Sequence, residues 1–184
     1  MYNDVMRVTA GRFKGRKLID RPFEHIRPTA DMVKQAVFNK IHFSLPDARV
    51  LDLFCGTGAL GIEALSRGAR EVVFVDADPR SVKLTKDNLA SLGAQETVLL
   101  CDYKKAIEKL EGQFDIILLD PPYKGGLYED CIKKIFEKHL LSDDGMIVCE
   151  QCKTDKFDFS PFEIIDEKTY GIKQVTYLKL RKEQ

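Results

Sequence analysis

The sequence predicts an α/β protein built on a doubly wound, mostly parallel sheet. After residue 45, short apolar runs alternate with amphipathic stretches, which is the order of strands and helices in such a sheet. Two of the runs, Val72–Val75 and Ile116–Leu119, are continuously apolar, as expected for strands buried on both faces. Pro79 suits the first turn of a helix, and Gly68 and Gly93 suit helix ends.

The elements of this sheet follow in order along the chain. The expected strands are Arg49–Leu53, Glu71–Val75, Thr97–Cys101, Phe114–Leu119 and Gly145–Glu150. The helices expected between them are Ala59–Ser66, Pro79–Leu92, Tyr103–Leu110 and Leu127–Leu140. Two further strands, Phe162–Glu167 and Gln174–Leu180, are separated only by a short turn around Gly171. Strands this close in sequence cannot be parallel neighbours, so we expect a C-terminal antiparallel hairpin that completes a seven-stranded sheet.

The residues in front of the sheet predict a separate N-terminal β-hairpin. Val5–Ala10 and Arg16–Ile19 flank the turn Gly11–Gly15. Thr29 then suits the N-cap of a helix that continues through Phe43. We therefore expect one domain, 1–184, in which residues 1–28 form a hairpin extension and residues 29–184 form the core.

Positive charge is concentrated in that extension. The 184 residues have a formal net charge of zero, but residues 1–28 carry seven Lys and Arg against three Asp and Glu. The segment therefore has an excess of four positive charges, and the rest of the chain has an equal negative excess. This asymmetry indicates a surface that faces a polyanion, although a solvated, cation-rich edge hairpin explains the charge equally well.

Composition also bounds the cellular setting. No apolar run is long enough to span a bilayer, and the first residues lack the apolar segment of a signal peptide, so we expect a cytoplasmic protein without a membrane partner. The five cysteines are scattered and odd in number, which predicts reduced thiols. Cys149 and Cys152 form a lone C-x-x-C without a second pair or a nearby histidine, so we expect no metal.

A glycine-rich turn joins the first core strand to its helix. Gly56, Gly58 and Gly61 have the spacing G-x-G-x-x-G. A tight turn without a ligand, a dinucleotide site and an S-adenosylmethionine site all fit this spacing. Asp52, at the mouth of the turn, would repel a pyrophosphate but could attract the ammonium of S-adenosylmethionine, directly or through water.

Acidic residues also end the next two strands. Asp76 is placed to accept both ribose hydroxyls, whereas Asp78 better suits a helix N-cap because Pro79 follows it. Asp102 can accept a hydrogen bond from adenine N6, or it can cap the helix that begins at the following residue. Three acids at three successive strand ends favour S-adenosylmethionine over NAD.

The turn Asp120–Tyr123 is the most specific signal in the chain. A buried strand delivers Asp120 to the carboxyl edge, where open α/β sheets bind ligands. Pro121 and Pro122 stiffen the turn and lack N–H groups. The Asp120 carboxylate and the Pro121 carbonyl could therefore hold the two N–H groups of an aryl amine and direct its lone pair at a sulfonium methyl. Tyr123 would stack on an unpaired or flipped base, unless the turn is a plain strand end and Tyr123 a core aromatic.

With these motifs placed, the chain resembles the bacterial 16S rRNA (guanine-N2)-methyltransferase D family nearly end to end. The resemblance is carried by residues 7–18, 27–29, 38–39, 52–65 and 120–123. It implies a Rossmann-like class I methyltransferase fold, S-adenosylmethionine as the cofactor, and formation of N2-methylguanine in 16S rRNA. The partner it implies is an assembled or assembling small ribosomal subunit.

The site expectations are as follows. The expected catalytic residues are Asp120, Pro121, Pro122 and Tyr123. The expected cofactor-binding residues are Asp52, Phe54, Gly56, Gly58, Asp76, Ala77, Asp102 and Tyr103. The expected rRNA-binding residues are Arg7, Arg12, Lys14, Arg16, Lys17 and Arg27. Methylation of an amine follows from the residues and guanine from the resemblance, so a DNA adenine-N6 methyltransferase, an NAD-dependent oxidoreductase and an rRNA-binding assembly factor remain alternatives.

Overall fold

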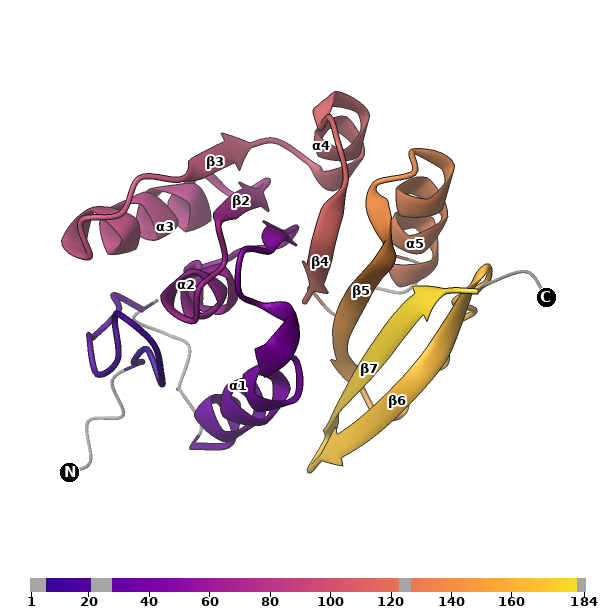
Figure 1. Ribbon diagram of the computed structural model, residues 1–184, viewed down its shortest axis with the longest axis horizontal. Helices are drawn as coiled ribbons and strands as arrows, with labels where there is room; N and C mark the ends of the chain where they lie inside the picture. Colours follow the sequence, from indigo (N-terminus) through magenta and orange to yellow (C-terminus); the bar gives the residue numbers. More distant parts are fainter. Residues whose placement is uncertain (1–5, 21–27, 123–126, 182–184) are drawn as a thin grey trace.

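A computed structural model describes residues 6–20, 28–122 and 127–181. Within these residues a seven-stranded mixed sheet has the strand order β3-β2-β1-β4-β5-β7-β6 and carries helices on both faces (Figure 1). The strands are β1 (Arg49–Asp52), β2 (Glu71–Asp76), β3 (Thr97–Leu100), β4 (Phe114–Leu119), β5 (Leu141–Cys152), β6 (Phe162–Tyr170) and β7 (Lys173–Leu180). The helices are α1 (Pro28–Lys40), the 3-10 helix η1 (His42–Ser44), α2 (Ala59–Ser66), α3 (Pro79–Ser91), α4 (Tyr103–Lys109) and α5 (Leu127–Glu137).

The pairing of the strands confirms the predicted sheet. The first five strands in the chain pair in parallel, β1 with both β2 and β4. β7 pairs antiparallel with β5 and β6, and Gly171 has a φ of 62° in the turn of this C-terminal hairpin. The strand order reverses between β1 and β4, and ligands of open α/β sheets bind outside the carboxyl ends of the strands at such a point.

Two apolar layers hold the helices to the sheet. Val50 and Leu51 are adjacent in β1 and both fully buried, but they point to opposite faces. Val50 joins the layer under α1, α2 and α3, whereas Leu51 joins the layer under α4 and α5. Burial of each such side chain stabilises the fold by roughly 1.5–3 kcal/mol relative to exposure. Nearly continuous apolar strands are therefore required, as the sequence predicted.

The predicted N-terminal hairpin of two strands is wrong. Residues 6–20, called here the basic loop, reverse direction, but the only β-pairing described in them is an isolated antiparallel bridge between Arg7 and Lys17. The backbone N–H groups of Thr9 and Ala10 do not pair across the loop, because both donate to the carboxylate of Glu63 in α2. The Glu63 side chain thus accepts the backbone N–H groups that pairing between two strands would need.

Other boundaries differ by a few residues. α1 begins at Pro28 and ends at Lys40, so the predicted N-cap at Thr29 and the continuation through Phe43 are wrong. β5 extends well beyond the predicted Gly145–Glu150. The five cysteines are free, as predicted. No helix in the described part of the chain is long and apolar enough to cross a bilayer.

Candidate active site

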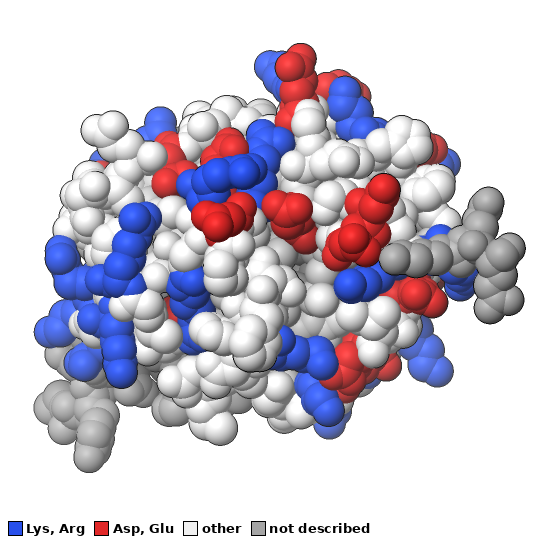
Figure 2. All heavy atoms as spheres, viewed as in Figure 1, with Lys and Arg blue, Asp and Glu red and all other residues white. Residues whose placement is uncertain are grey.

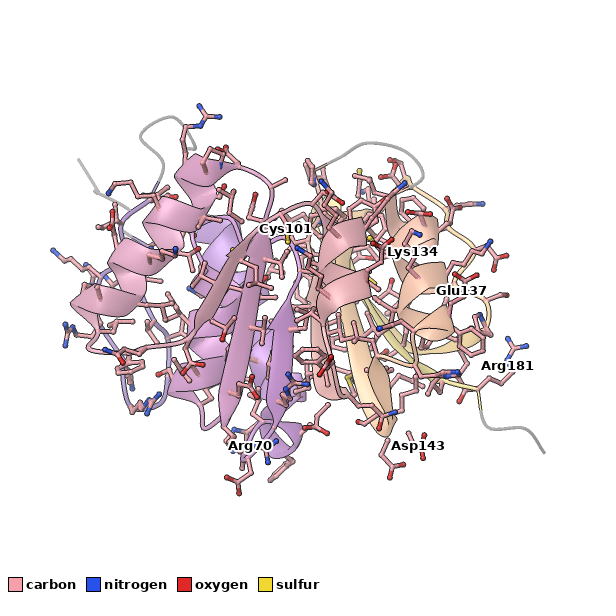
Figure 3. The ribbon with its side chains drawn as sticks, turned by 90° about the horizontal axis from the view of Figure 1, so that it is seen from above. Arg70, Cys101, Lys134, Glu137, Asp143 and Arg181 are labelled. Carbon is pink, nitrogen blue, oxygen red and sulfur yellow. The ribbon has the colours of Figure 1, made fainter. Side chains whose placement is uncertain are left out.

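Four of the predicted site acids, Asp52, Asp76, Asp102 and Asp120, lie at the carboxyl ends of parallel strands. Asp52, the last residue of β1, is in register with Leu118 of β4, so Asp120 follows two residues beyond it at the same edge. Figure 3 separates this edge, where Cys101 follows β3, from the opposite edge, where Arg70 and Asp143 lie. Parallel register therefore brings together motifs that are far apart in the sequence.

Asp52 lies beneath the glycine turn and is 2% exposed. Its Oδ2 accepts a hydrogen bond from the backbone N–H of Gly61 at 2.9 Å. Burial raises the pKa of Asp52 to about 7; the Gly61 N–H opposes this shift, and the charge of Asp76 adds to it. A Cβ on Gly61 would lie 2.3 Å from the Phe74 ring and 3.0 Å from Asp52 Oδ2, so only glycine permits this close packing of helix on strand.

Asp76 fixes the glycine turn from the neighbouring strand. Its Oδ2 accepts from the N–H of Gly56 at 2.9 Å and its Oδ1 from the N–H of Asp78 at 2.8 Å. Gly58 has a φ of 80°, and a Cβ there would lie 2.9 Å from Cγ2 of Thr85. Gly56 has a φ of 55°, and a Cβ there would meet none of the described residues within 4 Å. The turn is thus held from below and open beside Gly56, where a ligand can approach the backbone.

The third acid, Asp102, caps α4. Its Oδ1 accepts from the N–H groups of Lys104 at 3.0 Å and Lys105 at 3.1 Å, and these bonds, that of Lys105 foremost, lower the pKa of Asp102. The predicted alternative of an N-cap is confirmed here, and Asp78 is likewise the predicted cap of α3. Hydrogen bonding to adenine by Asp102 stays a prediction.

Two aromatic rings stand beside this acid. The rings of Phe54 and Tyr103 have centroids 5.6 Å apart, and the Tyr103 hydroxyl donates to Oδ2 of Asp130 in α5 at 2.6 Å. Burial and this hydrogen bond raise the pKa of Tyr103, and the same bond lowers the pKa of Asp130. The sequence did not predict this contact of Asp130, because in the sequence Asp130 is simply one polar residue of a predicted helix. Ala77, also expected near the cofactor, is exposed after β2.

The Asp-Pro-Pro turn follows β4. Asp120 is partly exposed, Pro121 is buried and Pro122 is exposed. The predicted stacking residue Tyr123 lies outside the described residues. The turn therefore lies at the same sheet edge as the glycine turn, with Asp120 partly exposed there.

The predicted RNA-binding cations lie on the basic loop. In the view of Figure 2, Lys and Arg side chains gather at the left of the molecule. The exposed cations of the basic loop are Arg7, Arg12, Lys14, Arg16 and Lys17. The guanidinium of Arg12 lies 4.6 Å from the Phe13 ring centroid, and Arg16 donates to the carbonyl of Ser91 at 2.5 Å. Arg27, the sixth predicted cation, lies outside the described residues.

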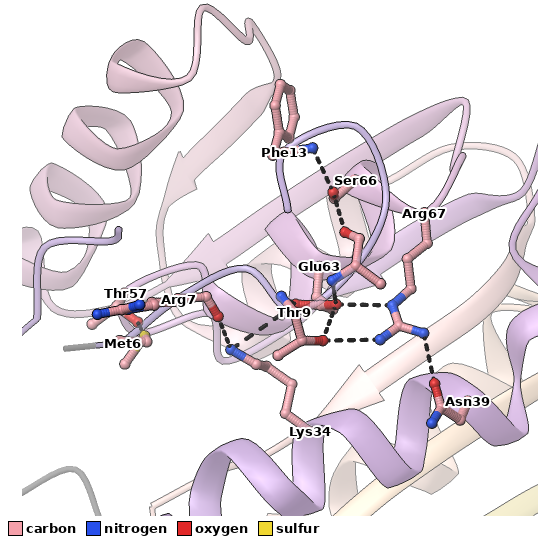
Figure 4. Close-up of polar contacts among 11 residues, drawn as sticks. Met6, Arg7, Thr9, Phe13, Lys34, Asn39, Thr57, Glu63, Ser66 and Arg67 are labelled. Carbon is pink, nitrogen blue, oxygen red and sulfur yellow. Dashed lines mark hydrogen bonds and ion pairs between the residues drawn. The ribbon is translucent and has the colours of Figure 1, made fainter. Parts of the chain in front are cut away.

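A buried acid that sequence reasoning missed anchors this loop (Figure 4). Glu63 is fully buried and accepts from the N–H and hydroxyl of Thr9 at 2.9 and 2.5 Å, and from the N–H of Ala10 at 3.1 Å. Its charge is met by Arg67 at 2.8 Å and by Lys34 at 4.0 Å. The available signal was an acidic residue inside the otherwise apolar run Ala59–Leu65.

Ser66 anchors the tip of the loop. Its hydroxyl accepts from the N–H of Phe13 at 2.9 Å and donates to the carbonyl of Ala10 at 2.6 Å (Figure 4). Gly11 passes so close that a Cβ there would lie 1.8 Å from the Ser66 carbonyl oxygen. The cations are thus carried on a fixed support rather than on a free arm.

Within residues 6–20, 28–122 and 127–181, no group of three or more His, Cys, Asp or Glu side chains is arranged to hold a metal ion. Cys149 is buried and Cys152 is partly exposed.

The chain matches a protein family, curated relatives and a solved structure. Residues 6–179 match the family model described as "Conserved hypothetical protein 95". The chain is 37% identical over 183 residues to "Putative rRNA methyltransferase YlbH" of Bacillus subtilis (strain 168), covering 96% of this chain and 100% of the relative. It is 35% identical over 174 residues to "Ribosomal RNA small subunit methyltransferase D" of Haemophilus influenzae, covering 91% and 90%. The solved structure of "Putative methyltransferase yhhF from Escherichia coli" superposes with a TM-score of 0.87 at 26% identity, covering 96% and 98%.

Proposed function

Since this chain belongs to the ribosomal RNA small subunit methyltransferase D family, we propose that it transfers a methyl group from S-adenosylmethionine to the N2 amine of a guanine in 16S rRNA. The observation that carries this proposal is the register of β1 with β4. Because Asp52 and Leu118 are in register, the Asp-Pro-Pro turn and the glycine turn follow neighbouring strands at one sheet edge, which supports a shared site for the amine and the cofactor.

The glycine turn fits S-adenosylmethionine. The open space beside Gly56 lets the ligand approach the backbone, and each carboxylate oxygen of Asp76 retains a lone pair for a ribose hydroxyl. Asp52, with its pKa near 7, would be held ionised by a neighbouring ammonium. Phe54 and Tyr103 offer an apolar wall for the adenine, and Gly58, Ala77 and Asp102 complete the proposed contacts. When bound, the cofactor supplies an electrophilic methyl on a sulfonium.

Asp120 and Pro121 have the chemistry to orient the amine. The lone pair of an aryl amine is delocalised into the base, so the amine is a poor nucleophile. The Asp120 carboxylate and the Pro121 carbonyl accept its two N–H groups and favour a tetrahedral shape, in which the lone pair is free to attack. The methylated amine is cationic and acidic, so no strong base is needed before the attack. Pro122 stiffens the turn, and Tyr123 stacks on the base after it leaves its helix.

The basic loop suits the phosphates of the RNA. Its exposed cations, with Arg27 beyond it, would position the substrate without reading its sequence, while the pocket selects the base. The chain's zero net charge favours a local contact with a large partner over binding along a whole RNA. We propose that this partner is the assembled or assembling small ribosomal subunit.

One assay separates this proposal from its alternatives. Labelled S-adenosylmethionine is incubated with the protein and with unmodified small subunits, free 16S rRNA or duplex DNA, and the methylated nucleoside is identified. N2-methylguanine in small-subunit RNA is the expected product. Methyladenine in DNA would replace the guanine assignment, and binding of NADH but not S-adenosylmethionine in calorimetry would replace methyl transfer. Tight binding to the subunit with little turnover would instead identify an assembly factor.

A further inference from the structure

Asn88 of α3 lies between the glycine turn and the basic loop and bonds to both. Its side chain is fully buried. Nδ2 donates to the carbonyl of Thr57 at 2.9 Å and to the carbonyl of Ile19 at 3.0 Å. Oδ1 accepts from the N–H of Ile19 at 2.7 Å. A second contact runs in parallel, from the Thr57 hydroxyl to the sulfur of Met6 at 3.6 Å (Figure 4).

These partners require an amide at this position. Two carbonyls face the two N–H groups of Asn88, and one N–H faces its oxygen, so the amide has one satisfied orientation. A carboxylate of the same shape would set oxygens against both carbonyls. An apolar side chain would leave the carbonyl of Thr57, whose bond to Asn88 is buried, and the partly buried backbone groups of Ile19 without these partners.

The two bonded segments belong to the two halves of the proposed site. Thr57 lies between Gly56 and Gly58 in the proposed cofactor turn. Ile19 follows the exposed cations Arg16 and Lys17 by two to three residues. Asn88 therefore links the segment that follows these cations directly to the cofactor turn.

We propose that Asn88 is a positioning residue for methyl transfer to RNA. This inference rests on the proposed function. By holding the basic loop against the glycine turn, Asn88 makes an RNA docked on the loop present its base at the methyl donor. Misplacement of reacting groups by about 1 Å can cost about 10²-fold in rate, even when binding is unchanged.

The test compares Asn88→Asp and Asn88→Ser with two controls in the full chain. Ser66→Ala removes bonds to the loop tip without touching Thr57. Ser91→Ala removes only a hydroxyl that donates to the Asn88 carbonyl on the same helix. Methyl transfer from labelled S-adenosylmethionine to unmodified small subunits gives kcat and KM, and calorimetric stoichiometry gives the fraction able to bind cofactor.

For the Asn88 variants we expect kcat per competent molecule to fall roughly 10- to 100-fold. The KM for subunits and its salt dependence should stay near wild type, because the cations remain. Ser66→Ala should raise KM more than it lowers kcat, and Ser91→Ala should match wild type. If Asn88→Asp does not fold, Asn88→Ser, which keeps one donor, decides the matter by the same measure.

Two results would overturn the inference. The first is a kcat per competent molecule that stays within about 3-fold of wild type, a range below the roughly 10-fold loss expected of misplacement. The second is an equal loss of kcat in Ser66→Ala. A wild-type protein that methylates no RNA would overturn the proposed function as well, whereas an active wild type with fully active Asn88 variants would overturn only this inference.

Discussion

Replacing Glu63 by glutamine is expected to lower the free energy of unfolding by about 3–5 kcal/mol. The carboxylate is fully buried and accepts four hydrogen bonds, three from Thr9 and Ala10 and one from Arg67. The side chains of Arg67 and Lys34 are only 5% and 6% exposed, so loss of this charge removes an acid that both buried cations contact. The glutamine NH₂ would also face donors rather than acceptors.

Urea unfolding followed by circular dichroism measures this effect. With a slope of about 2 kcal/mol per molar, the midpoint should fall by about 2 M. Glu137→Gln is the matched control, because its ion pair with Lys133 is 3.8 Å long and its side chain is 58% exposed. That control should change stability by no more than about 0.5 kcal/mol. A loss below about 1 kcal/mol in Glu63→Gln, the scale of a surface pair, would refute the view that a buried charge anchors the basic loop.

Three further predictions concern the site. The pKa of Asp52 is raised from 3.8 to about 7, so the folded chain keeps a proton that the unfolded chain releases above about pH 4. The contribution of this proton to the free energy of unfolding is fully present below about pH 4 and is lost as the pH rises through about 7. Wild type should therefore lose up to about 4 kcal/mol relative to Asp52→Asn between pH 4 and pH 8 in denaturant titrations, and a pH-independent difference would contradict this. Asp120→Asn should lower kcat for RNA methylation by roughly 10²-fold or more in the labelled-methyl assay, because the NH₂ group of the new asparagine would face the substrate amine. Calorimetry should show an unchanged cofactor affinity, and a loss of that affinity would argue for a different role of Asp120. Joint replacement of Arg12, Lys14 and Lys17 by alanine should reduce the slope of log K against log salt by about 2–3 in filter binding, and an unchanged slope would remove the loop from the RNA contact.

Local sequence predicted most of the fold. The continuous apolar runs of β2 and β4 predicted strands buried on both faces, and Gly171, with a positive φ, lies in the turn between β6 and β7. Pro79 and Asp78 mark the start of α3 within one residue. These features depend on neighbours close in the chain, so composition and spacing are sufficient to predict them.

The N-terminal segment shows where that reasoning failed. Two segments that flank a glycine-containing turn predicted a hairpin of two strands, but Glu63, more than fifty residues away, takes the backbone donors of Thr9 and Ala10. Asn88 forms its bonds to Ile19 across 69 positions. Asn88 is not marked by any local pattern. The acid inside the apolar run Ala59–Leu65 is visible in the sequence, but the backbone groups that it bonds are not, because they depend on the tertiary structure.

By itself, then, the sequence determined the α/β class, the parallel sheet with its antiparallel end, and the acidic and glycine-rich turns at the strand ends, because each follows from short-range periodicity and backbone restriction. Only the tertiary structure determined that α2 and α3 hold the basic loop through hydrogen bonds, and that Asn88 links the end of this loop to the cofactor turn. Those bonds exist because folding removes water from polar groups distant in the chain and leaves them to satisfy one another.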